Sequence, residues 1–200
     1  LESPSQPTPI DVVQPVRDNV IFRPNPGPQT NFLAASEREV LYGGAAGGGK
    51  SYAILADPLR YMAHPQFSGL ILRHTTEELR ELIWKSQEMY PKIYPGIKWS
   101  ERKMQWQHPS GGKLWMSYLD RDEDVMRYQG LSFSYIAWDE LTQWPTPFAY
   151  NYMRSRLRTA AADLPVFMRA TTNPGGPGHQ WVRKMFIVPS APGKSFYATD

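Results

Sequence analysis

The sequence predicts an α/β fold in which a mostly parallel central sheet is flanked by helices and carries a β-hairpin insertion. The first observation is a strand-like run, residues 39–42, that leads through a glycine-rich loop into a helix-like segment. The second is a series of short apolar runs, typical of strands buried on both faces, at residues 69–72, 133–138 and 166–170. The third is the alternation of polar and apolar residues on both sides of the Pro-Ser-Gly-Gly stretch at 109–112, which is typical of a hairpin.

The chain of 200 residues has the length of one ordinary domain, but its first part differs in composition from the rest. Residues 1–28 hold seven prolines, which favour an extended arm, and residues 29–200 are expected to form the folded domain. The formal net charge of +3 permits a nucleic-acid partner without arguing for one, because such partners need a concentrated basic face. The absence of cysteine excludes disulfides and cysteine-ligated metals. No apolar run approaches the roughly 20 residues that span a bilayer, so no membrane partner is expected.

The glycine-rich loop matches the phosphate-binding pattern Gly-x-x-x-x-Gly-Lys-Ser from Gly44 to Ser51. Glycines leave the backbone N–H groups of such a loop open, and the N-terminus of the next helix adds its positive dipole end. Lys50 is expected to reach the β- and γ-phosphates as a catalytic cation, and the Ser51 hydroxyl to ligate Mg²⁺. The expected ligands are therefore ATP and Mg²⁺. The residues expected to contact the nucleotide are Gly44, Ala45, Ala46, Gly47, Gly48, Gly49, Lys50 and Ser51.

Two further polar positions flank the expected nucleotide site. Gln29 lies just upstream of the first strand, and its amide matches the donor and acceptor of an adenine edge. An ordinary surface glutamine is the alternative. Arg73 and His74 follow the apolar run 69–72, at the end of a strand where open α/β sheets bind their ligands.

The second half of a nucleotide-hydrolysis site is expected after the apolar run 133–138. Asp139 would hold the Mg²⁺, and Glu140 would act as general base on the attacking water. The run 166–170 is followed by hydroxyl and amide side chains that are placed to sense the γ-phosphate, and an Asn-Pro turn is the alternative for this stretch. These side chains are Thr171, Thr172 and Asn173.

The segments between these motifs are assigned by local signals. Pro58 is expected to end or kink the helix that follows the phosphate loop. Thr75-x-x-Glu78 predicts the start of a helix that runs to about residue 90, and the charged residues 120–124 predict a solvated helix start. Three tryptophans near the hairpin are expected to form the apolar face of the sheet, with stacking on bases as the alternative: Trp99, Trp106 and Trp115.

In this order, four motifs resemble the N-terminal ATPase domain of the large terminase subunit of tailed double-stranded DNA bacteriophages. They are the loop 43–51, Trp138-Asp139-Glu140, the Thr-Thr-Asn-Pro stretch 171–174, and Gly178-His179-x-Trp181-Val182. The resemblance covers roughly residues 29–188. It implies an additional-strand, RecA-like P-loop ATPase in which the stretch beginning at Thr171 couples hydrolysis to DNA movement.

The resemblance also implies how such a protein works. It would pump double-stranded DNA into a procapsid in the host cell cytoplasm, as a homo-oligomeric ring on the portal protein, with a small terminase subunit as a further partner. A C-terminal nuclease domain is usual in the family and is not expected within these 200 residues. Many terminases have an early arginine in the phosphate loop, whereas this loop has the standard form without it.

A ring ATPase needs an arginine from a neighbouring subunit, because charge builds up on the γ-phosphoryl oxygens in the transition state. Arg127 is the first candidate, since a short loop separates it from the strand that precedes Asp139. Arg158 and Arg73 follow in that order. A solvent-facing or ion-paired arginine is the alternative at each position.

Two other functions share part of these motifs. A RecA-like helicase or DNA translocase would also use Lys50, Asp139 and Glu140, but usually adds a second RecA-like domain that this sequence does not offer. A nucleotide-dependent switch would bind ATP without productive turnover. Glu140 argues against the switch, because a switch needs no general base beside its metal ligand.

Overall fold

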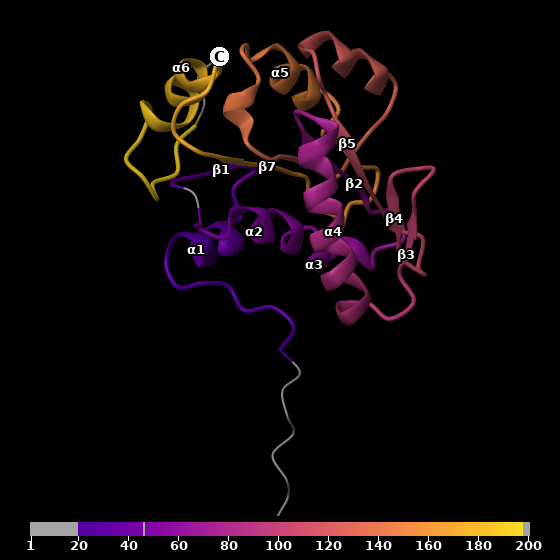
Figure 1. Cartoon of the computed structure of the whole chain (residues 1–200). Coiled ribbons are helices and arrows are strands. Elements are labelled where there is room, and N and C mark those ends of the chain that lie inside the picture. Colours follow the sequence, from indigo (N-terminus) through magenta and orange to yellow (C-terminus); the bar gives the residue numbers. More distant parts are fainter. Residues whose placement is uncertain (1–19, 46, 198–200) are drawn as a thin grey trace, which may run out of the picture.

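The central sheet has seven strands in the order β1-β7-β6-β2-β5-β4-β3 (Figure 1). The computed structural model describes residues 20–45 and 47–197. The first five strands in this order are parallel, and β4 and β3 are antiparallel to their neighbours. The strands are β1 Glu39–Gly43, β2 Ser68–Arg73, β3 Lys98–Ser100, β4 Gln105–Gln107, β5 Lys113–Tyr118, β6 Tyr135–Trp138 and β7 Phe167–Thr172. The predicted mostly parallel α/β fold is therefore confirmed.

The predicted hairpin forms between β4 and β5, with Trp106 opposite Leu114. It is not set apart from the main sheet, because β5 also pairs in parallel with β2 along its whole length. Leu114 and Met116 of β5 are fully buried, which explains why this strand lies inside the sheet. The hairpin thus extends the sheet at the side opposite β1.

The helices cover both faces of the sheet. Helices α2, α3 and α4 form one apolar cluster with the sheet, and η1, η2, α5 and α6 form the other. Figure 1 shows α1 to α4 below the sheet, with α5 and α6 above it. The helices are α1 Pro28–Ala34, α2 Lys50–Ala56, α3 Leu59–Met62, α4 Thr76–Ile93, η1 Asp122–Tyr128, η2 Leu141–Gln143, α5 Phe148–Arg154, α6 His179–Val182 and η3 Arg183–Ile187. In the described part of the chain, no helix is long and apolar enough to cross a membrane.

The local signals of the sequence have the expected effects, with some differences in length. α2 ends at Ala56 and Pro58 separates it from α3. Thr75 caps α4, because its hydroxyl accepts a hydrogen bond from the backbone N–H of Glu78 at 3.3 Å. α4 continues three residues past the expected end, and the helix start expected at 120–124 is the 3-10 helix η1 with an acidic first turn.

The tryptophans near the hairpin belong to the protein interior to different degrees. Trp106 is buried, and its indole N–H donates to the Ser86 hydroxyl at 2.9 Å. Trp99 and Trp115 are partly buried and pack against the two apolar clusters. The structure therefore agrees with the core assignment for Trp106, which has no free face for a base.

A buried ion pair ties β7 to the end of α2. Arg169 is 1% exposed and Asp57 is 3% exposed, and Arg169 Nε donates to Asp57 Oδ2 at 3.2 Å. The guanidinium also donates to the carbonyls of Glu37 at 2.8 Å and Ala35 at 2.9 Å. Arg169 thus joins three segments: β7, the helix that follows the phosphate loop, and the connection between α1 and β1.

The N-terminal arm expected for residues 1–28 falls only partly in the described structure. Residues 1–19 lie outside it, and residues 20–27 have no regular secondary structure apart from a bend and the start of a turn. α1 begins at Pro28, a position that a proline tolerates because the first N–H groups of a helix have no partner within the helix. Gln29 therefore lies in the first turn of α1.

Candidate active site

The polar ends of four parallel strands meet at one edge of the sheet. In the register of the sheet, Gly43 lies opposite Thr172, and Leu72 lies opposite Trp138. The residues that follow these strands are therefore neighbours in space, because parallel strands end at the same edge. The phosphate loop, Asp139, Glu140, Thr171, Asn173 and Arg73 come together at this edge.

The phosphate loop has the backbone conformation that its glycines allow. Gly44, Gly47 and Gly49 have φ angles of 147°, 84° and 72°, a region that other residues rarely adopt. Gly49 caps α2, so the loop leads directly into a helix N-terminus. Ala46 lies outside the described residues. A cavity of about 420 Å³ opens beside the loop and is lined by Pro28, Tyr42, Gly43, Gly44, Ala45, Gly47, Gly48 and Lys50.

Lys50 folds back over its own loop. Its ammonium group donates to the carbonyls of Gly44 at 3.0 Å and Ala45 at 2.7 Å, and the residue is only 7% exposed. Ser51 follows in the first turn of α2 and is half-buried. Lys50 is thus held at the cavity wall, where phosphate oxygens could replace the two carbonyls.

Gln29 supports the loop from behind. Its amide NH₂ donates to the carbonyl of Gly49 at 2.8 Å, and its amide oxygen accepts from the backbone N–H of Asn25 at 2.6 Å. The residue is 3% exposed, so it is not an ordinary surface glutamine. Both groups that were expected to read adenine are occupied in this structure, and base reading would require both bonds to break.

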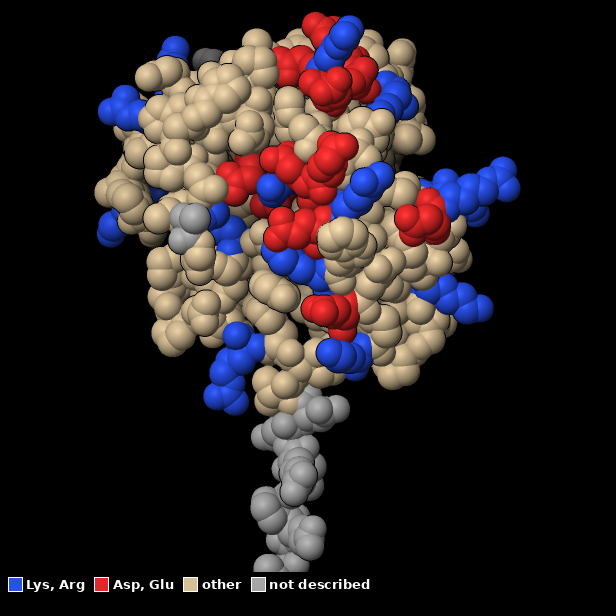
Figure 2. Space-filling view, in the orientation of Figure 1, with Lys and Arg blue, Asp and Glu red and all other residues tan. Residues whose placement is uncertain are grey.

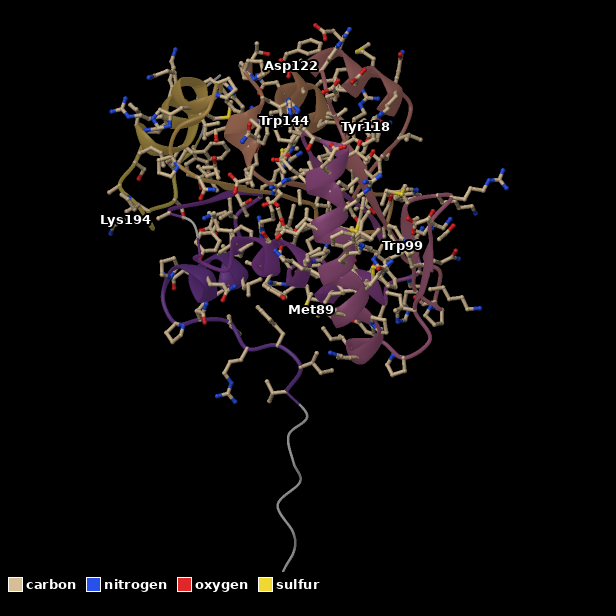
Figure 3. All side chains as sticks on the ribbon, in the orientation of Figure 1. Met89, Trp99, Tyr118, Asp122, Trp144 and Lys194 are labelled. Atoms are coloured by element: carbon tan, nitrogen blue, oxygen red, sulfur yellow. The ribbon has the colours of Figure 1, made fainter. Side chains whose placement is uncertain are left out.

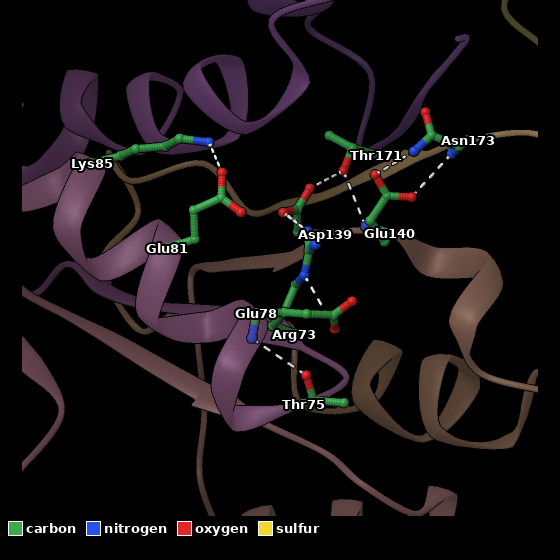
Figure 4. A network of polar contacts seen from close by, with 9 residues as sticks. All are labelled: Arg73, Thr75, Glu78, Glu81, Lys85, Asp139, Glu140, Thr171 and Asn173. Carbon is green, nitrogen blue, oxygen red and sulfur yellow. Dashed lines mark hydrogen bonds and ion pairs between the residues drawn. The ribbon is translucent and has the colours of Figure 1, made fainter. Parts of the chain in front are cut away.

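Asp139 is the most enclosed carboxylate of the site, with 1% of its surface exposed. Its Oδ1 accepts a hydrogen bond from the Thr171 hydroxyl, and its Oδ2 forms an ion pair with NH1 of Arg73 (Figure 4). Arg73 Nε lies 3.5 Å from Glu78 Oε2, at the start of α4. Arg73 therefore bridges the carboxylate that follows β6 and the first turn of α4.

Glu140 is held by Asn173. Its carboxylate accepts from the side-chain amide of Asn173 at 2.8 Å and from the backbone N–H at 3.2 Å. Glu140 has a φ of 59°, which a side chain adopts only when its surroundings enforce it. Burial, and then the neighbouring Asp139 charge, raise the pKa of Glu140. This carboxyl therefore accepts a proton more readily than a solvent-exposed glutamate, as a general base requires.

Thr172 connects the end of β7 to η2. Its hydroxyl donates to the hydroxyl of Thr142 at 2.8 Å and accepts from the backbone N–H of Thr142 at 3.4 Å. Thr171 faces Asp139 and the backbone N–H of Glu140, at 3.2 Å from the latter. The three predicted residues at the end of β7 thus each touch the segment that begins with Asp139.

The oxygen-bearing residues at this edge fit a magnesium ion that is bound together with phosphates. Mg²⁺ is usually held by one or two carboxylates, water and substrate phosphates, and Asp139 and Ser51 supply a carboxylate and a hydroxyl. The described residues contain no group of three or more His, Asp or Glu side chains that could hold a metal alone. The residues therefore fit a metal that arrives with a nucleotide.

The three candidate arginines differ in their surroundings. Arg127 is exposed, donates to the Ser117 hydroxyl at 3.2 Å and to the Tyr118 carbonyl, and stacks on the Tyr128 ring at 5.3 Å. Figure 3 shows Tyr118 at the upper edge of the molecule, near η1. Arg158 is exposed and donates to the Ser132 hydroxyl at 2.7 Å. Among the three, Arg73 is the one at the carboxylates, although the sequence ranked it last.

One face of the molecule has a distinct charge distribution. Figure 2 shows acidic side chains gathered in its middle, over α4, with Lys and Arg side chains scattered toward the sides. A concentrated basic stripe, which DNA-binding surfaces have, is not found on this face. This agrees with the small net charge of the sequence.

Comparisons with known proteins identify the family. The family model described as "Terminase large subunit, T4likevirus-type, N-terminal" matches residues 41–181. No curated protein matches the sequence.

Solved structures show the same fold. The large terminase ATPase domain of Thermus phage P74-26 has a TM-score of 0.57 at 15% identity over 78% of this chain. The large terminase of a thermophilic bacteriophage in complex with ADP has a TM-score of 0.56 at 14% identity over 75% of this chain. The HK97 bacteriophage large terminase has a TM-score of 0.60 at 15% identity over 82% of this chain. The alignments span 66%, 39% and 36% of those three chains.

The match to the family model extends from the β1 strand before the phosphate loop to the segment around Trp181, and so includes every motif at the sheet edge except Gln29. The RecA-like fold expected from the resemblance agrees with the terminase ATPase domains among the solved structures. This chain therefore belongs to the family of the N-terminal, ATPase part of phage large terminase subunits.

Proposed function

We propose that this chain is the motor domain of a DNA-packaging terminase, which hydrolyses ATP with Mg²⁺ and uses the energy to move double-stranded DNA into a procapsid. One observation carries the proposal: the phosphate loop and the Asp139-Glu140 pair lie at the same sheet edge, with the residues of the coupling motif between them. The ADP bound to the related terminase of a thermophilic bacteriophage supports nucleotide binding at this edge.

Lys50 and the loop would bind the nucleotide. The backbone N–H groups of residues 44–49 and the N-terminus of α2 suit a polyphosphate, and Lys50 lies at the wall of the same cavity. Asp139 and Ser51 would hold Mg²⁺, which when bound neutralises charge on the β- and γ-phosphates. Gln29 would keep Gly49 in place through its bond to the Gly49 carbonyl.

Glu140 would act as the general base. Its raised pKa and its position beside Asp139 suit a group that takes the proton of the attacking water. Asn173 binds both oxygens of this carboxylate, so a change at the γ-phosphate that moves Glu140 would also move the end of β7. This supports the assignment of Thr171, Thr172 and Asn173 to coupling.

Arg127 would act on the nucleotide of a neighbouring subunit. It lies near the end of β5, four strand positions from β1, or about 19 Å at a spacing of about 4.8 Å per strand. This distance is too long for an arginine side chain to reach its own phosphate loop. The exposed position of Arg127 therefore supports action in trans, within a homo-oligomeric ring on the portal protein.

The wider setting of the motor follows from the family. The proposed partners are double-stranded DNA, the portal protein and a small terminase subunit, and the proposed location is the host cell cytoplasm. A helicase or other RecA-like DNA translocase is the second candidate. DNA-stimulated packaging into procapsids by the complete terminase, without strand separation of a short duplex, would decide for the packaging motor.

The test of ATP hydrolysis is Glu140→Gln. The amide keeps the shape of the side chain but cannot take up the proton, so nucleotide binding should persist while turnover falls by about 10²–10⁴. ATP hydrolysis is measured by phosphate release with Mg²⁺ and with EDTA, and binding by titration calorimetry. Equal turnover of the variant and the wild type at matched nucleotide occupancy would show that Glu140 is not the base, as in a switch without productive turnover.

The test of Arg127 is a mixing experiment. Arg127→Ala should leave nucleotide affinity of the monomer unchanged and lower turnover of the assembled motor by about 10³ or more. Mixing it with Glu140→Gln subunits should restore part of the activity, because some interfaces then pair an intact Glu140 with an intact Arg127. No recovery in rings that demonstrably contain both variants would exclude action of Arg127 in trans.

A further inference from the structure

We propose that Arg73 is a positioning residue that occupies Asp139 in the nucleotide-free chain and transfers to Glu78 when Asp139 takes up a divalent cation. The inference rests on the proposed function, because it assigns Asp139 to the metal. It places Arg73 in its own subunit's site, in contrast to the role in trans for which the sequence made it a candidate.

The first observation is the enclosure of Asp139. A carboxylate that is 1% exposed needs a partner for its charge, and Arg73 and Thr171 are the partners in this structure. Thr171 occupies Oδ1, so the oxygen available for a metal is Oδ2, where Arg73 NH1 now lies. A guanidinium and a divalent cation repel each other, so the two cannot share this oxygen at full strength.

The second observation is a receptor beside Arg73. Glu78 Oε2 lies 3.5 Å from Arg73 Nε, and neither of these two buried atoms has a hydrogen-bond partner among the described residues. Glu78 is fixed in space because it lies in the first turn of α4, next to the capping residue Thr75 (Figure 4). The guanidinium could therefore form hydrogen bonds with Glu78 after a small movement, without exposing an unpaired charge.

The third observation is that the pair is incomplete as a structural link. The buried arginine of β7, Arg169, donates from Nε, NH1 and NH2, whereas Arg73 hydrogen-bonds through NH1 alone among the described residues. A purely structural arginine would be expected to satisfy its buried Nε as well. This difference fits a side chain with two alternative partners.

The first experiment measures the effect of Mg²⁺ alone on the melting temperature of the 200-residue chain. In the wild type, Arg73 competes with the metal, so Mg²⁺ at about 10 mM should change Tm by less than about 1 °C. In Arg73→Gln, Asp139 has lost its cation, and the same Mg²⁺ concentration should raise Tm by about 3 °C or more. The matched control is Arg154→Gln, which breaks an ion pair with Glu39 outside the site and should respond like the wild type.

The second experiment tests the transfer to Glu78 and does not depend on the stability of the Arg73 variant. The affinity of the ATP analogue AMPPNP is measured by calorimetry in Mg²⁺ and in EDTA. In Glu78→Gln, Arg73 has lost its alternative partner, so the gain in affinity from Mg²⁺ should fall by about 5-fold or more. The affinity in EDTA should equal that of the wild type.

The outcomes separate this inference from the proposed function. If Arg73→Gln responds to Mg²⁺ no more than the wild type and Arg154→Gln, Arg73 does not compete for Asp139. An unchanged gain from Mg²⁺ in Glu78→Gln would exclude the transfer. Both results in a wild-type chain that binds AMPPNP refute only the role of Arg73, whereas a wild-type chain that binds no AMPPNP refutes the proposed function itself.

Discussion

Asp57→Ala is expected to lower the melting temperature more than the loss of any exposed acidic residue. Asp57 is the only carboxylate that hydrogen-bonds the buried guanidinium of Arg169 among the described residues, at 3.2 Å, and both residues are at most 3% exposed. Removing one partner of a buried ion pair leaves the other charge without compensation, which costs about 3–5 kcal/mol of unfolding free energy. For a domain of this size, about 2–4 °C per kcal/mol gives a decrease of about 6–20 °C.

The assay is thermal unfolding followed by circular dichroism, with Glu81→Ala as the control. Glu81 forms an ion pair with Lys85 at 2.5 Å on the exposed side of α4, a type of pair worth about 0.5 kcal/mol. The control should therefore lose less than about 2 °C. Combining Asp57→Ala with Arg169→Met should recover part of the lost stability, because no buried charge then remains unpaired. If Asp57→Ala loses no more than Glu81→Ala, the reasoning about the buried pair is wrong.

Three further predictions concern the active site and the core. Gly49→Ala should weaken ATP binding by at least about 10-fold in titration calorimetry, because the position has φ 72° and the new Cβ would lie 2.6 Å from Gln29 Nε2; wild-type affinity would show that the loop adapts. Asn173→Ala should move the acid limb of kcat/KM to higher pH. The pKa of Glu140 is already raised, the lost hydrogen bond had stabilised its charged form, and activity falls as the pH drops through that pKa; an unmoved limb would exclude Glu140 as the titrating base. Trp106→Phe should lower the unfolding free energy by about 1 kcal/mol in urea titrations, because the indole bond to Ser86 is lost; a neutral result would mean that this bond adds no stability.

The fold and the main site residues could be predicted because they depend on local patterns. The strand, glycine loop and helix from residue 39 to 56 form one continuous unit, and the apolar run before Asp139 has the composition of a buried strand. The end of β7 could be placed beside Asp139 since parallel strands end at the same edge of a sheet. These inferences needed no knowledge of side-chain contacts.

The pairs that stabilise the site could not be predicted in the same way. Arg73 and Asp139 are 66 residues apart, and Asp57 and Arg169 are 112 residues apart. Their contact depends on the strand order, which places β2 next to β6 and α2 against β7. The sequence did signal that Arg73 lies at the ligand edge, but it contained nothing that distinguished a bond to Asp139 from a role in a neighbouring subunit. The occupied amide of Gln29 was likewise invisible, because Asn25 and Gly49 approach it only in the folded chain.

The position of Lys50 has a consequence for the thermodynamics of nucleotide binding. Its ammonium group already has two acceptors, the carbonyls of Gly44 and Ala45, so a phosphate would replace existing hydrogen bonds instead of adding new ones. The measured contribution of Lys50 to affinity is then the difference between two sets of partners, and is smaller than the strength of its bond to phosphate. Since Gly44 and Ala45 are exposed, water can take over their carbonyls once the lysine leaves. The release of Lys50 therefore leaves no buried acceptor unpaired, and the loop can alternate between its empty and loaded forms at little energetic cost.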